Sequence, residues 1–278
     1  MSDPGHGTAT VDAGTVAPIV GRIAAADRRR RLLFRLAFVL TWVVILGGFV
    51  LWLVSGDRFD IEFVGKHAPF IIGAAPLTIF IALTSIALAI GFALLGALGR
   101  ISKFAPTYAI ASLYVSVVRG TPLIVQILFV FVALPQIVPA AARIPIVGIG
   151  IFALAFNYGA YMTEIFRAGI EAVPGGQREA AAALGMSERR IMLRVVMPQA
   201  IRIVTPAIGN EFIAMIKDSA LVSIIGIQEL LWRARTIGSA NFRSFETLIL
   251  AATVFWILTI IFSFFQERLE QRMARGDR

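Results

Sequence analysis

Polar and ionisable side chains occur inside long apolar runs of this sequence. Asn157, Tyr161 and Glu164 lie within residues 147–170, and their spacing by four and three places them on one face of a helix. Ionisable groups at membrane depth face protein or water, and they mark candidate substrate or ion paths. The spacing therefore predicts a polar stripe that faces away from lipid.

Two further apolar runs carry polar groups. Residues 106–134 contain Arg119, Gly120 and Pro122, and the glycine and proline weaken a helix there. Residues 201–227 contain Asn210, Glu211, Lys217 and Asp218. Charges within a membrane usually find partners, so Glu164 has Arg119 or Arg167 as candidate partners, and Lys217 has Asp218 or Glu211. A substrate-facing role and simple ion pairing both remain open.

Catalytic chemistry finds little support in the sequence. The chain has no cysteine, which excludes disulfides, thiol nucleophiles and thiolate metal sites. No phosphate-binding loop of the Gly-x-x-x-x-Gly-Lys-Ser/Thr type occurs, so we expect no nucleotide on this chain. His6 and His67 fall in a tail and a loop and read as solvated, while the methionines read as packing residues. We expect a protein that is not an enzyme and binds no metal or cofactor.

Composition identifies an integral membrane protein. Of 278 residues, 58% are hydrophobic and 15% charged, and the mean hydropathy is +0.82; soluble domains are typically about 45–50% apolar and about 25% charged. The net charge of +9 is explained by basic loops and chain ends, so nucleic acid is not expected as a partner.

The apolar runs predict an all-α protein with about six membrane helices. Their expected ranges are 32–54, 70–99, 106–134, 147–170, 201–227 and 245–265. Residues 1–31 are predicted to be a disordered basic tail, and residues 269–278 a second tail. The basic clusters predict that both termini are cytoplasmic, which places residues 55–69, 135–148 and 228–244 outside. Arg233, Arg235 and Arg243 in the last of these run against the positive-inside tendency.

One charged segment, residues 169–203, interrupts the apolar pattern. After Pro174-Gly175-Gly176, residues 177–184 are strong helix formers, and Gly185 is expected to end this helix. Ser187 is placed to cap a second helix, and Pro198 marks its end or a kink. The segment is therefore predicted to be a helix-turn-helix outside the lipid. Its alanines let another protein approach closely, although an alanine-rich loop without a partner fits composition alone.

Glu179, Ala180, Ala181, Gly185 and Pro198 of this segment closely resemble the EAA coupling motif of ABC importer permeases. Further matches to the polar amino acid branch of that family are Arg119-Gly120-Thr121-Pro122, the block 157–165, Asn210-Glu211 and residues 217–221. The resemblance covers about residues 70–268 and implies a type I transmembrane fold, with a five-helix core and residues 32–54 as an added helix.

The resemblance also implies the assembly and its location. It implies a bacterial inner-membrane permease that pairs with a second permease subunit, with ATPase subunits that carry ATP and Mg²⁺, and with an external solute-binding protein. The amino acid would pass Asn157, Tyr161, Glu164 and Asn210, while Arg119, Gly120, Pro122, Glu211, Lys217 and Asp218 would serve gating or structure. Two alternatives are a secondary transporter or channel without an ATPase, which broken polar helices would fit, and an intramembrane enzyme.

Overall fold

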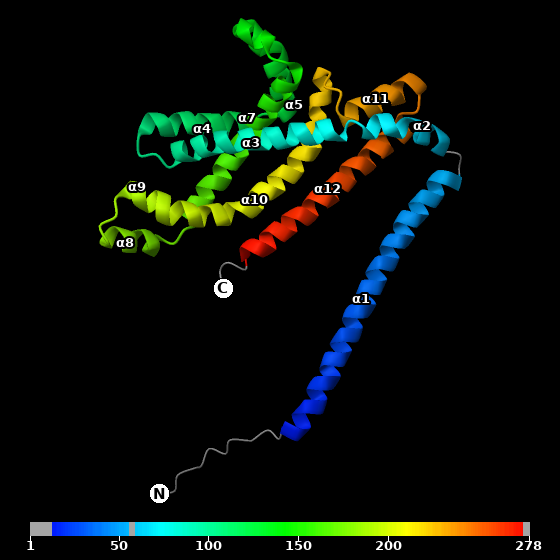
Figure 1. The fold of residues 1–278 in the computed structure, drawn as a ribbon, viewed down its shortest axis with the longest axis horizontal. Coiled ribbons are helices and arrows are strands. Elements are labelled where there is room, and N and C mark those ends of the chain that lie inside the picture. The colour runs from blue at the N-terminus through cyan, green and yellow to red at the C-terminus, as the bar shows by residue number, and fades with distance from the viewer. Residues whose placement is uncertain (1–12, 56–58, 275–278) are drawn as a thin grey trace. The chain divides into compact units, whose positions relative to one another are not determined.

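The computed structural model describes residues 13–55 and 59–274, and all regular elements within these ranges are helical (Figure 1). The all-α prediction is confirmed for this part of the chain. The chain divides after Asp60 into two compact units, each of which is described by itself below.

The first unit contains a single long helix, α1 (Ala13–Ser55). Residues 27–53 of α1 are apolar and long enough to cross a membrane, and they include most of the predicted helix 32–54. Residues 13–31, predicted to be a disordered tail, are helical instead, because alanines and arginines are good helix formers and extend the apolar helix backwards. The remainder of that predicted tail, residues 1–12, lies outside the described residues.

The second unit begins at Ile61 and contains every other element. These are α2 (Ile61–Ile72), α3 (Ala75–Arg100), α4 (Ala105–Arg119), α5 (Leu123–Leu128), the π-helix η1 (Phe129–Ala133), α6 (Leu134–Ile137), the 3-10 helix η2 (Pro139–Arg143), α7 (Ile146–Glu171), α8 (Gly175–Ala183), α9 (Glu188–Ile191), the π-helix η3 (Met192–Val196), α10 (Met197–Asp218), the 3-10 helix η4 (Ser219–Ile225), α11 (Leu230–Asn241) and α12 (Ser244–Ala274). The predicted tail from residue 269 continues α12 as far as Ala274.

The predicted crossings are found with two corrections. Five helical stretches of the described chain are long and apolar enough to cross a membrane, and α4 with α5–α6 is a sixth candidate whose 107° bend is that of a broken span or a re-entrant loop. The run 106–134 is therefore a broken helix rather than a straight one, because Gly120 and Pro122 interrupt it. The loop predicted at residues 55–69 is largely helix α2, which continues into α3 as one stretch.

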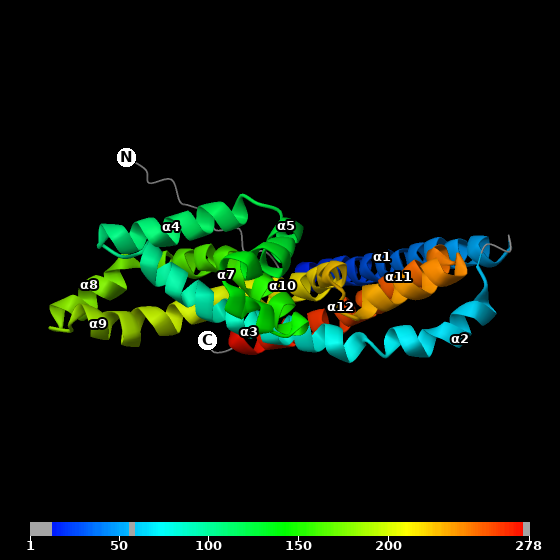
Figure 2. The same cartoon turned by 90° about the horizontal axis from the view of Figure 1, so that it is seen from above.

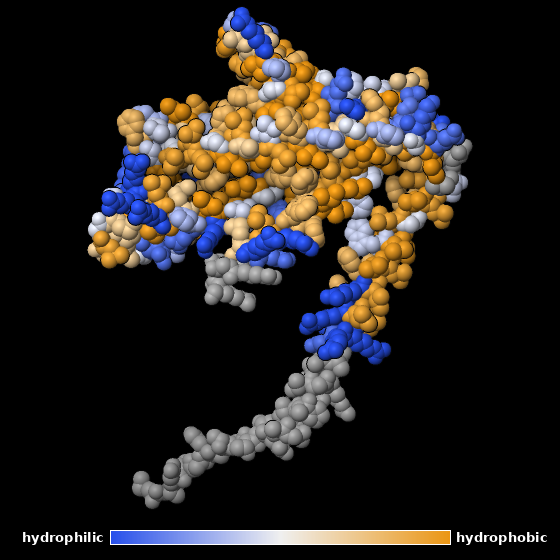
Figure 3. Space-filling view, viewed as in Figure 1, coloured by the Kyte–Doolittle hydropathy of each residue, from blue (hydrophilic) through white to orange (hydrophobic). Residues whose placement is uncertain are grey.

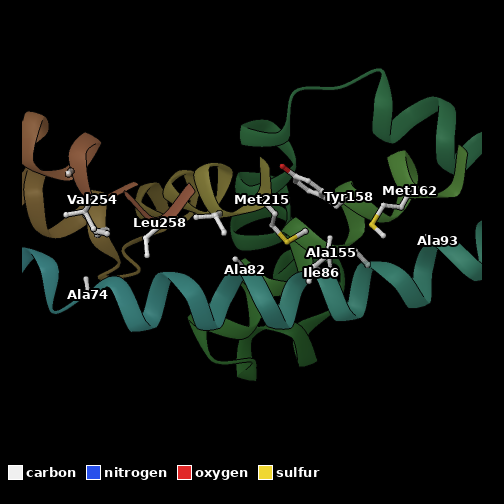
Figure 4. Close-up of a cluster of buried hydrophobic side chains, with 14 of the residues drawn as sticks. Ala74, Ala82, Ile86, Ala93, Ala155, Tyr158, Met162, Met215, Val254 and Leu258 are labelled. Carbon is white, nitrogen blue, oxygen red and sulfur yellow. The ribbon is translucent and has the colours of Figure 1, made fainter. Parts of the chain in front are cut away.

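A core of small and medium side chains holds α3, α7, α10 and α12 together (Figure 4). Helix α3 contributes Ala82, Ala89 and Ala93, which are fully buried. Helix α7 contributes Ala155 and Met162, also fully buried. Small residues allow close backbone approach, which drives helix association where lipid removes the hydrophobic advantage. The α3–α7 pair is the most extensive contact of the unit.

Gly96 marks the tightest point of that pair. A Cβ atom at Gly96 would collide with the side chain of Thr163 on α7, whereas a Cβ at Gly91 of the same helix would meet nothing within 4 Å. We expect Gly96→Leu to destabilise the folded protein by about 1–3 kcal/mol through overpacking. Thermal unfolding of detergent-purified protein checks this, with Gly91→Leu as the matched control. Equal unfolding midpoints for the two variants would contradict the assigned α3–α7 contact.

The two ends of the second unit carry different helices. Figures 1 and 2 both place α8 and α9 at one end and α2 and α11 at the other. Figure 3 shows mostly hydrophobic residues over the middle of this unit, with hydrophilic residues at these two ends and in smaller groups at the top tip and along the lower edge. A hydrophobic middle is typical of a unit whose middle lies in the hydrocarbon core of a membrane and whose ends face water.

Helix α11 lies inside the segment predicted as external, residues 228–244. Its N-cap is Glu229, whose carboxylate Oε1 accepts a hydrogen bond from the Trp232 backbone N–H at 2.8 Å. The Arg233 guanidinium donates to the Phe70 carbonyl at the end of α2, and it also lies over the Phe70 ring. Arg233 thus fastens α11 to the break between α2 and α3.

Glu229 is fully buried, and its second carboxylate oxygen has no partner among the described residues. Burial raises the pKa of Glu229 from 4.5 to about 7. The folded state therefore holds a proton that the unfolded state has released, so stability falls as pH rises from about 4.5 to about 7, by an amount of order 3 kcal/mol. We expect Glu229→Gln to flatten this pH dependence of the unfolding midpoint. The exposed control Glu62→Gln should leave the slope unchanged, and an unchanged slope in Glu229→Gln would contradict the assignment.

Candidate functional site

The break between α4 and α5 forms one wall of the candidate site. Gly120 caps α4, and a Cβ there would lie 2.8 Å from the Ser116 carbonyl oxygen, so the close turn requires glycine. Pro122 is the N-cap of α5 in an extended conformation. The Gln126 side-chain amide donates to the carbonyls of Val118 (2.7 Å) and Thr121 (3.1 Å) and to the Thr121 hydroxyl (2.8 Å). The amide of one glutamine therefore bridges both sides of the break, together with the Thr121 hydroxyl, which donates to the Val117 carbonyl at 2.9 Å.

Helix α7 forms the second wall. Asn157 is 5% exposed, and its side-chain amide donates to the side-chain oxygen Oε1 of Gln126 at 3.0 Å, which ties α7 to the break. The Tyr158 hydroxyl donates to the Asp218 carboxylate at 2.8 Å. The Tyr161 ring lies under the Arg119 guanidinium, with 5.2 Å between the guanidinium carbon and the ring centre. Both tyrosines line the cavity described below, and each holds a charged group: Tyr161 contacts the Arg119 guanidinium, and Tyr158 contacts the Asp218 carboxylate.

Helix α10 forms the third wall and carries two carboxylates. Glu211 and Asp218 are seven residues apart, which places them on one face two turns from each other. Glu211 has no hydrogen bond or ion pair among the described residues, and Asp218 accepts only from Tyr158 there. The predicted pairing of Lys217 with Asp218 or Glu211 is not found in this part of the chain, because Lys217 points to a different, apolar groove.

These three walls enclose an open cavity of about 330 Å³. Its lining residues are Thr121, Pro122, Leu123, Asn157, Tyr158, Tyr161, Glu211 and Asp218. Five residues singled out from the sequence thus line one cavity, although they come from three separate apolar runs: Pro122, Asn157, Tyr161, Glu211 and Asp218. Thr121 and Tyr158 belong to the motif matches but are not predicted site residues, and Gln126, which bonds to the lining residue Asn157, is not predicted either. Their proximity to Pro122 and Asn157 in the sequence was the available signal.

Glu164 does not line this cavity. Its carboxylate forms ion pairs with Arg167 at 2.8 Å and with Arg100 of α3 at 3.2 Å. Arg100 also donates to the Ser112 hydroxyl of α4 at 2.6 Å. Of the two candidate partners predicted for Glu164, Arg167 is confirmed, whereas Arg119 lies over the Tyr161 ring. Through these two arginines, Arg167 and Arg100, Glu164 joins α3, α4 and α7.

Asn210 is also absent from the cavity lining. Its side-chain oxygen accepts a hydrogen bond from Gln266 of α12 at 3.0 Å. The Gln266 amide also donates to the Pro206 carbonyl at 3.2 Å, beside the proline inside α10. Asn210 is displaced from Glu211 by the rotation of one helical residue, about 100°, and so it contacts α12 rather than the cavity.

The charged segment 169–203 folds as a short helix followed by a turn and a second helix. Helix α8 begins at Gly175, two residues earlier than predicted, and Gly185 stands at φ +73° directly after it. Ser187 occupies the N-cap of α9, but its side chain makes no capping bond. Pro198 does not end the helix: the chain continues from α9 through the π-helix η3 into α10, with Pro198 in its first turn.

Helix α8 has two distinct faces. Ala181 is 5% exposed and packs with Ile170, Val173, Ile191, Val196 and Ala200. Ala181 therefore holds α8 to the membrane helices, whereas the motif predicts it as part of a partner contact. The outer face exposes Glu179, Ala180 and Leu184, and Leu184 is 83% exposed. We refer to these three residues as the α8 outer face. Arg178 fixes the base of α8 by donating to the Ile170 carbonyl at 2.6 Å.

Comparison with known protein families gives a match over most of the second unit. Residues 86–275 match the family described as "Binding-protein-dependent transport system inner membrane component". The arginine transport system permease protein ArtQ of Bacillus subtilis (strain 168) is 36% identical over 209 residues, which cover 75% of this chain and 94% of ArtQ. The glutamine transport system permease protein GlnP of Escherichia coli (strain K12) is 33% identical over 222 residues, 78% and 98% of the two chains.

Solved structures give a similar result. A crystal structure of an amino acid ABC transporter with histidines aligns with a TM-score of 0.71 at 39% identity, covering 77% of this chain and 98% of the other. The MetNI methionine ABC transporter in an inward-facing conformation aligns with a TM-score of 0.59 at 17% identity, covering 77% and 97%, and this likeness concerns the fold alone.

Proposed function

The chain belongs to the family of binding-protein-dependent transport system inner membrane components, and we propose that its cavity carries a basic amino acid through the membrane. It has the type I fold and is the permease of an ABC amino acid importer. The observation that carries the substrate proposal is the pair of carboxylates, Glu211 and Asp218, that line the cavity without a cationic partner in the described chain.

Charge counting at the cavity favours a substrate with two positive groups. Glu211 and Asp218 are half-buried, and a carboxylate that is partly withdrawn from water is costly unless a cation or hydrogen-bond donors compensate it. A zwitterionic amino acid brings one ammonium group, which compensates one carboxylate, and a basic side chain compensates the second. Arg119 does not line the cavity, but its guanidinium lies over the ring of the lining residue Tyr161, and we assign it as the cation that attracts the substrate's own carboxylate. A volume of about 330 Å³ is at the small end of ligand sites and suits one amino acid.

The remaining polar residues keep this arrangement in place. Asn157 and Gln126 hold the break between α4 and α5, and Gly120 permits its turn. Lys217 lines a separate groove together with Trp256, and we assign it a structural role in that groove. Glu164 and Asn210 belong to helix-joining contacts.

The coupling assignment rests on the α8 outer face. We expect the ATPase subunits, which bind ATP and Mg²⁺, to dock there on Glu179, Ala180 and Leu184. Ala181 and Arg178 fasten α8 to α7, so displacement of α8 moves the helix that carries Asn157 and Tyr161. The cavity then changes its access from one side of the membrane to the other. A second permease subunit and an external solute-binding protein complete the expected assembly, with both termini and α8 on the cytoplasmic side of the inner membrane.

The family match favours neither of the two alternatives, a secondary transporter or an intramembrane enzyme. The family is a transport component of binding-protein-dependent systems.

Reconstitution tests the proposal. The permease is placed in liposomes with its co-purified ATPase and the cognate binding protein, and ATP-dependent uptake of labelled arginine is measured. We expect unlabelled arginine and lysine to compete, and citrulline, the neutral analogue of arginine with the same shape, to compete at least about tenfold less well. Equal competition by citrulline contradicts the charge assignment, and uptake without an ATPase contradicts the importer assignment.

A further inference from the structure

The first unit carries a group of arginines at one end of its apolar span. We refer to the four consecutive residues Arg28–Arg31 as the arginine collar; Arg35 follows one turn later, and Asp27 is the single acidic residue among residues 27–35. None of these arginines forms a hydrogen bond, ion pair or ring contact with a described residue of the first unit. The family match covers residues 86–275, and α1 lies before them. These charges therefore have neither a partner in their own unit nor a role given by the family match.

Helix geometry places the collar at the depth of lipid headgroups. Residues 36–55, the part of α1 after Arg35, span about 30 Å, which is the thickness of the hydrocarbon core of a bilayer. Trp52, near the far end of this stretch, is of a residue type enriched at membrane interfaces. Arg35 then lies at the opposite edge of the hydrocarbon core, and the collar begins about 6 Å beyond it. The headgroup region extends about 5–8 Å beyond that edge, so the guanidinium groups of the collar lie among the headgroups.

The side chains of the collar point to all sides of α1. Successive residues of an α-helix are rotated by about 100°, so four consecutive arginines surround the helix axis. Figure 3 shows hydrophilic residues on both sides of α1 at this level. The apolar run at residues 42–46 surrounds the axis in the same way. A folded protein partner contacts one face of a helix, whereas the lipids of a membrane enclose it, so this arrangement favours lipid as the partner.

The chemistry of the collar favours lipids with a net negative headgroup. Guanidinium groups donate two parallel hydrogen bonds to a phosphate. Phosphatidylglycerol leaves the charge of its phosphate uncompensated, whereas phosphatidylcholine carries its own cation. Clusters of four or more basic residues next to a membrane helix are typical of anionic-lipid binding. Arg35 lies one turn from Arg31 on the same face, and its long side chain can extend back towards the same phosphate.

We propose that the arginine collar is a binding site for anionic phospholipids, whose phosphate groups surround α1 in the leaflet at its N-terminal end. The observation that carries the proposal is the ring of four unpartnered guanidinium groups at headgroup depth. The inference goes beyond the proposed function, because it assigns to the first unit a site that takes no part in carrying the amino acid. The permease therefore retains anionic lipid around α1.

Single substitutions in the collar test the ring arrangement. Detergent-purified, full-length permease is titrated with phosphatidylglycerol, and bound lipid is counted by native mass spectrometry. We expect Arg28→Gln, Arg29→Gln, Arg30→Gln and Arg31→Gln each to weaken binding about fivefold, the effect of one basic residue near an anionic membrane surface. The matched control Arg143→Gln removes the same charge from an exposed arginine of η2 and should have no effect. Losses no larger than that of the control, or a loss confined to one of the four positions, overturn the proposal.

Replacing the whole collar separates charge from side-chain identity. We expect glutamine at all four positions to weaken the binding of phosphatidylglycerol at least about 100-fold, and lysine at all four to weaken it less than about tenfold, since an ammonium group still attracts a phosphate. Ser55→Cys, labelled with a membrane-impermeant reagent in a chain without other cysteines, reports whether α1 keeps its orientation. The single substitutions, which leave three arginines of the collar in place, decide the proposal if the glutamine variant inverts. Equal binding by the glutamine and lysine variants overturns it.

Competing ligands distinguish lipid from other anions. Phosphatidylcholine should displace phosphatidylglycerol at least about tenfold less well, because its headgroup has no net charge. Inorganic phosphate at millimolar concentration should not displace it, and displacement by phosphate overturns the lipid assignment. Collar variants that lose co-purified ATPase subunits but keep their lipid assign the collar to a protein contact, which also overturns the proposal. Lipid binding is measured without ATP, binding protein or uptake, so its failure is distinguishable from failure of the proposed function.

Discussion

Replacing Asp218 with asparagine is expected to lower the affinity of the purified permease for arginine at least about 30-fold, which corresponds to about 2 kcal/mol. The change keeps an acceptor for the Tyr158 hydroxyl, so the fold is retained, but it removes one of two negative charges that line the substrate cavity. Calorimetric titration of detergent-purified permease with arginine and with citrulline measures the effect without the binding protein. The loss should concern arginine far more than citrulline.

Two further variants make this expectation specific. Glu211→Gln should produce a similar loss, because Glu211 has no partner of its own in the described chain. Lys217→Gln changes a neighbouring charge that points to a different groove, and its arginine affinity should stay within about threefold of the unaltered protein. If Asp218→Asn and Lys217→Gln bind arginine equally well, the acidic cavity is not the substrate site.

Leu184→Asp is expected to abolish ATP-dependent uptake while the permease itself stays folded. Leu184 is 83% exposed, so a charge there costs the isolated permease almost nothing. At a docked interface the same change loses the burial of a leucine, about 1.5–3 kcal/mol, and adds a buried charge. We expect recovery of ATPase subunits with the tagged permease to fall at least about tenfold, and uptake to fall to background.

Ser187→Asp provides the control for this result. It introduces the same charge in the same segment, at the N-cap of α9, where aspartate is a favourable residue. Its ATPase recovery and uptake should match those of the unaltered protein. Normal uptake by Leu184→Asp would show that the α8 outer face is not where the ATPase docks.

The sequence predicted the helical architecture because its signals are local. Apolar runs, glycine and proline positions and basic clusters each report on a few neighbouring residues, and these sufficed for the membrane helices and for the end of α8 at Gly185. The 107° bend between α4 and α5 was signalled only as a weak point at Gly120 and Pro122. Its size depends on packing against α7 and on Gln126, which no local pattern contains.

The candidate site was predictable to the extent that helix faces decide it. Asn157 and Tyr161 share a face and reach the cavity, but Glu164 lies seven residues from Asn157, about 10.5 Å along the helix axis. At that level of the helix Glu164 forms an ion pair with Arg100 of α3. Helical periodicity cannot predict a contact with a residue 64 positions earlier in the chain. Periodicity places residues around a helix, whereas their neighbours depend on tertiary contacts.

The glutamine that closes the break between α4 and α5 has a consequence for the resting permease. Because the Gln126 amide satisfies both carbonyls and the hydroxyl next to it, the broken backbone needs no file of water molecules to keep it hydrated. The shape of the break is therefore held by a side chain of the same protein, and it does not depend on what fills the cavity. A substrate that enters or leaves can exchange with water in the cavity while the wall formed by the break stays in place.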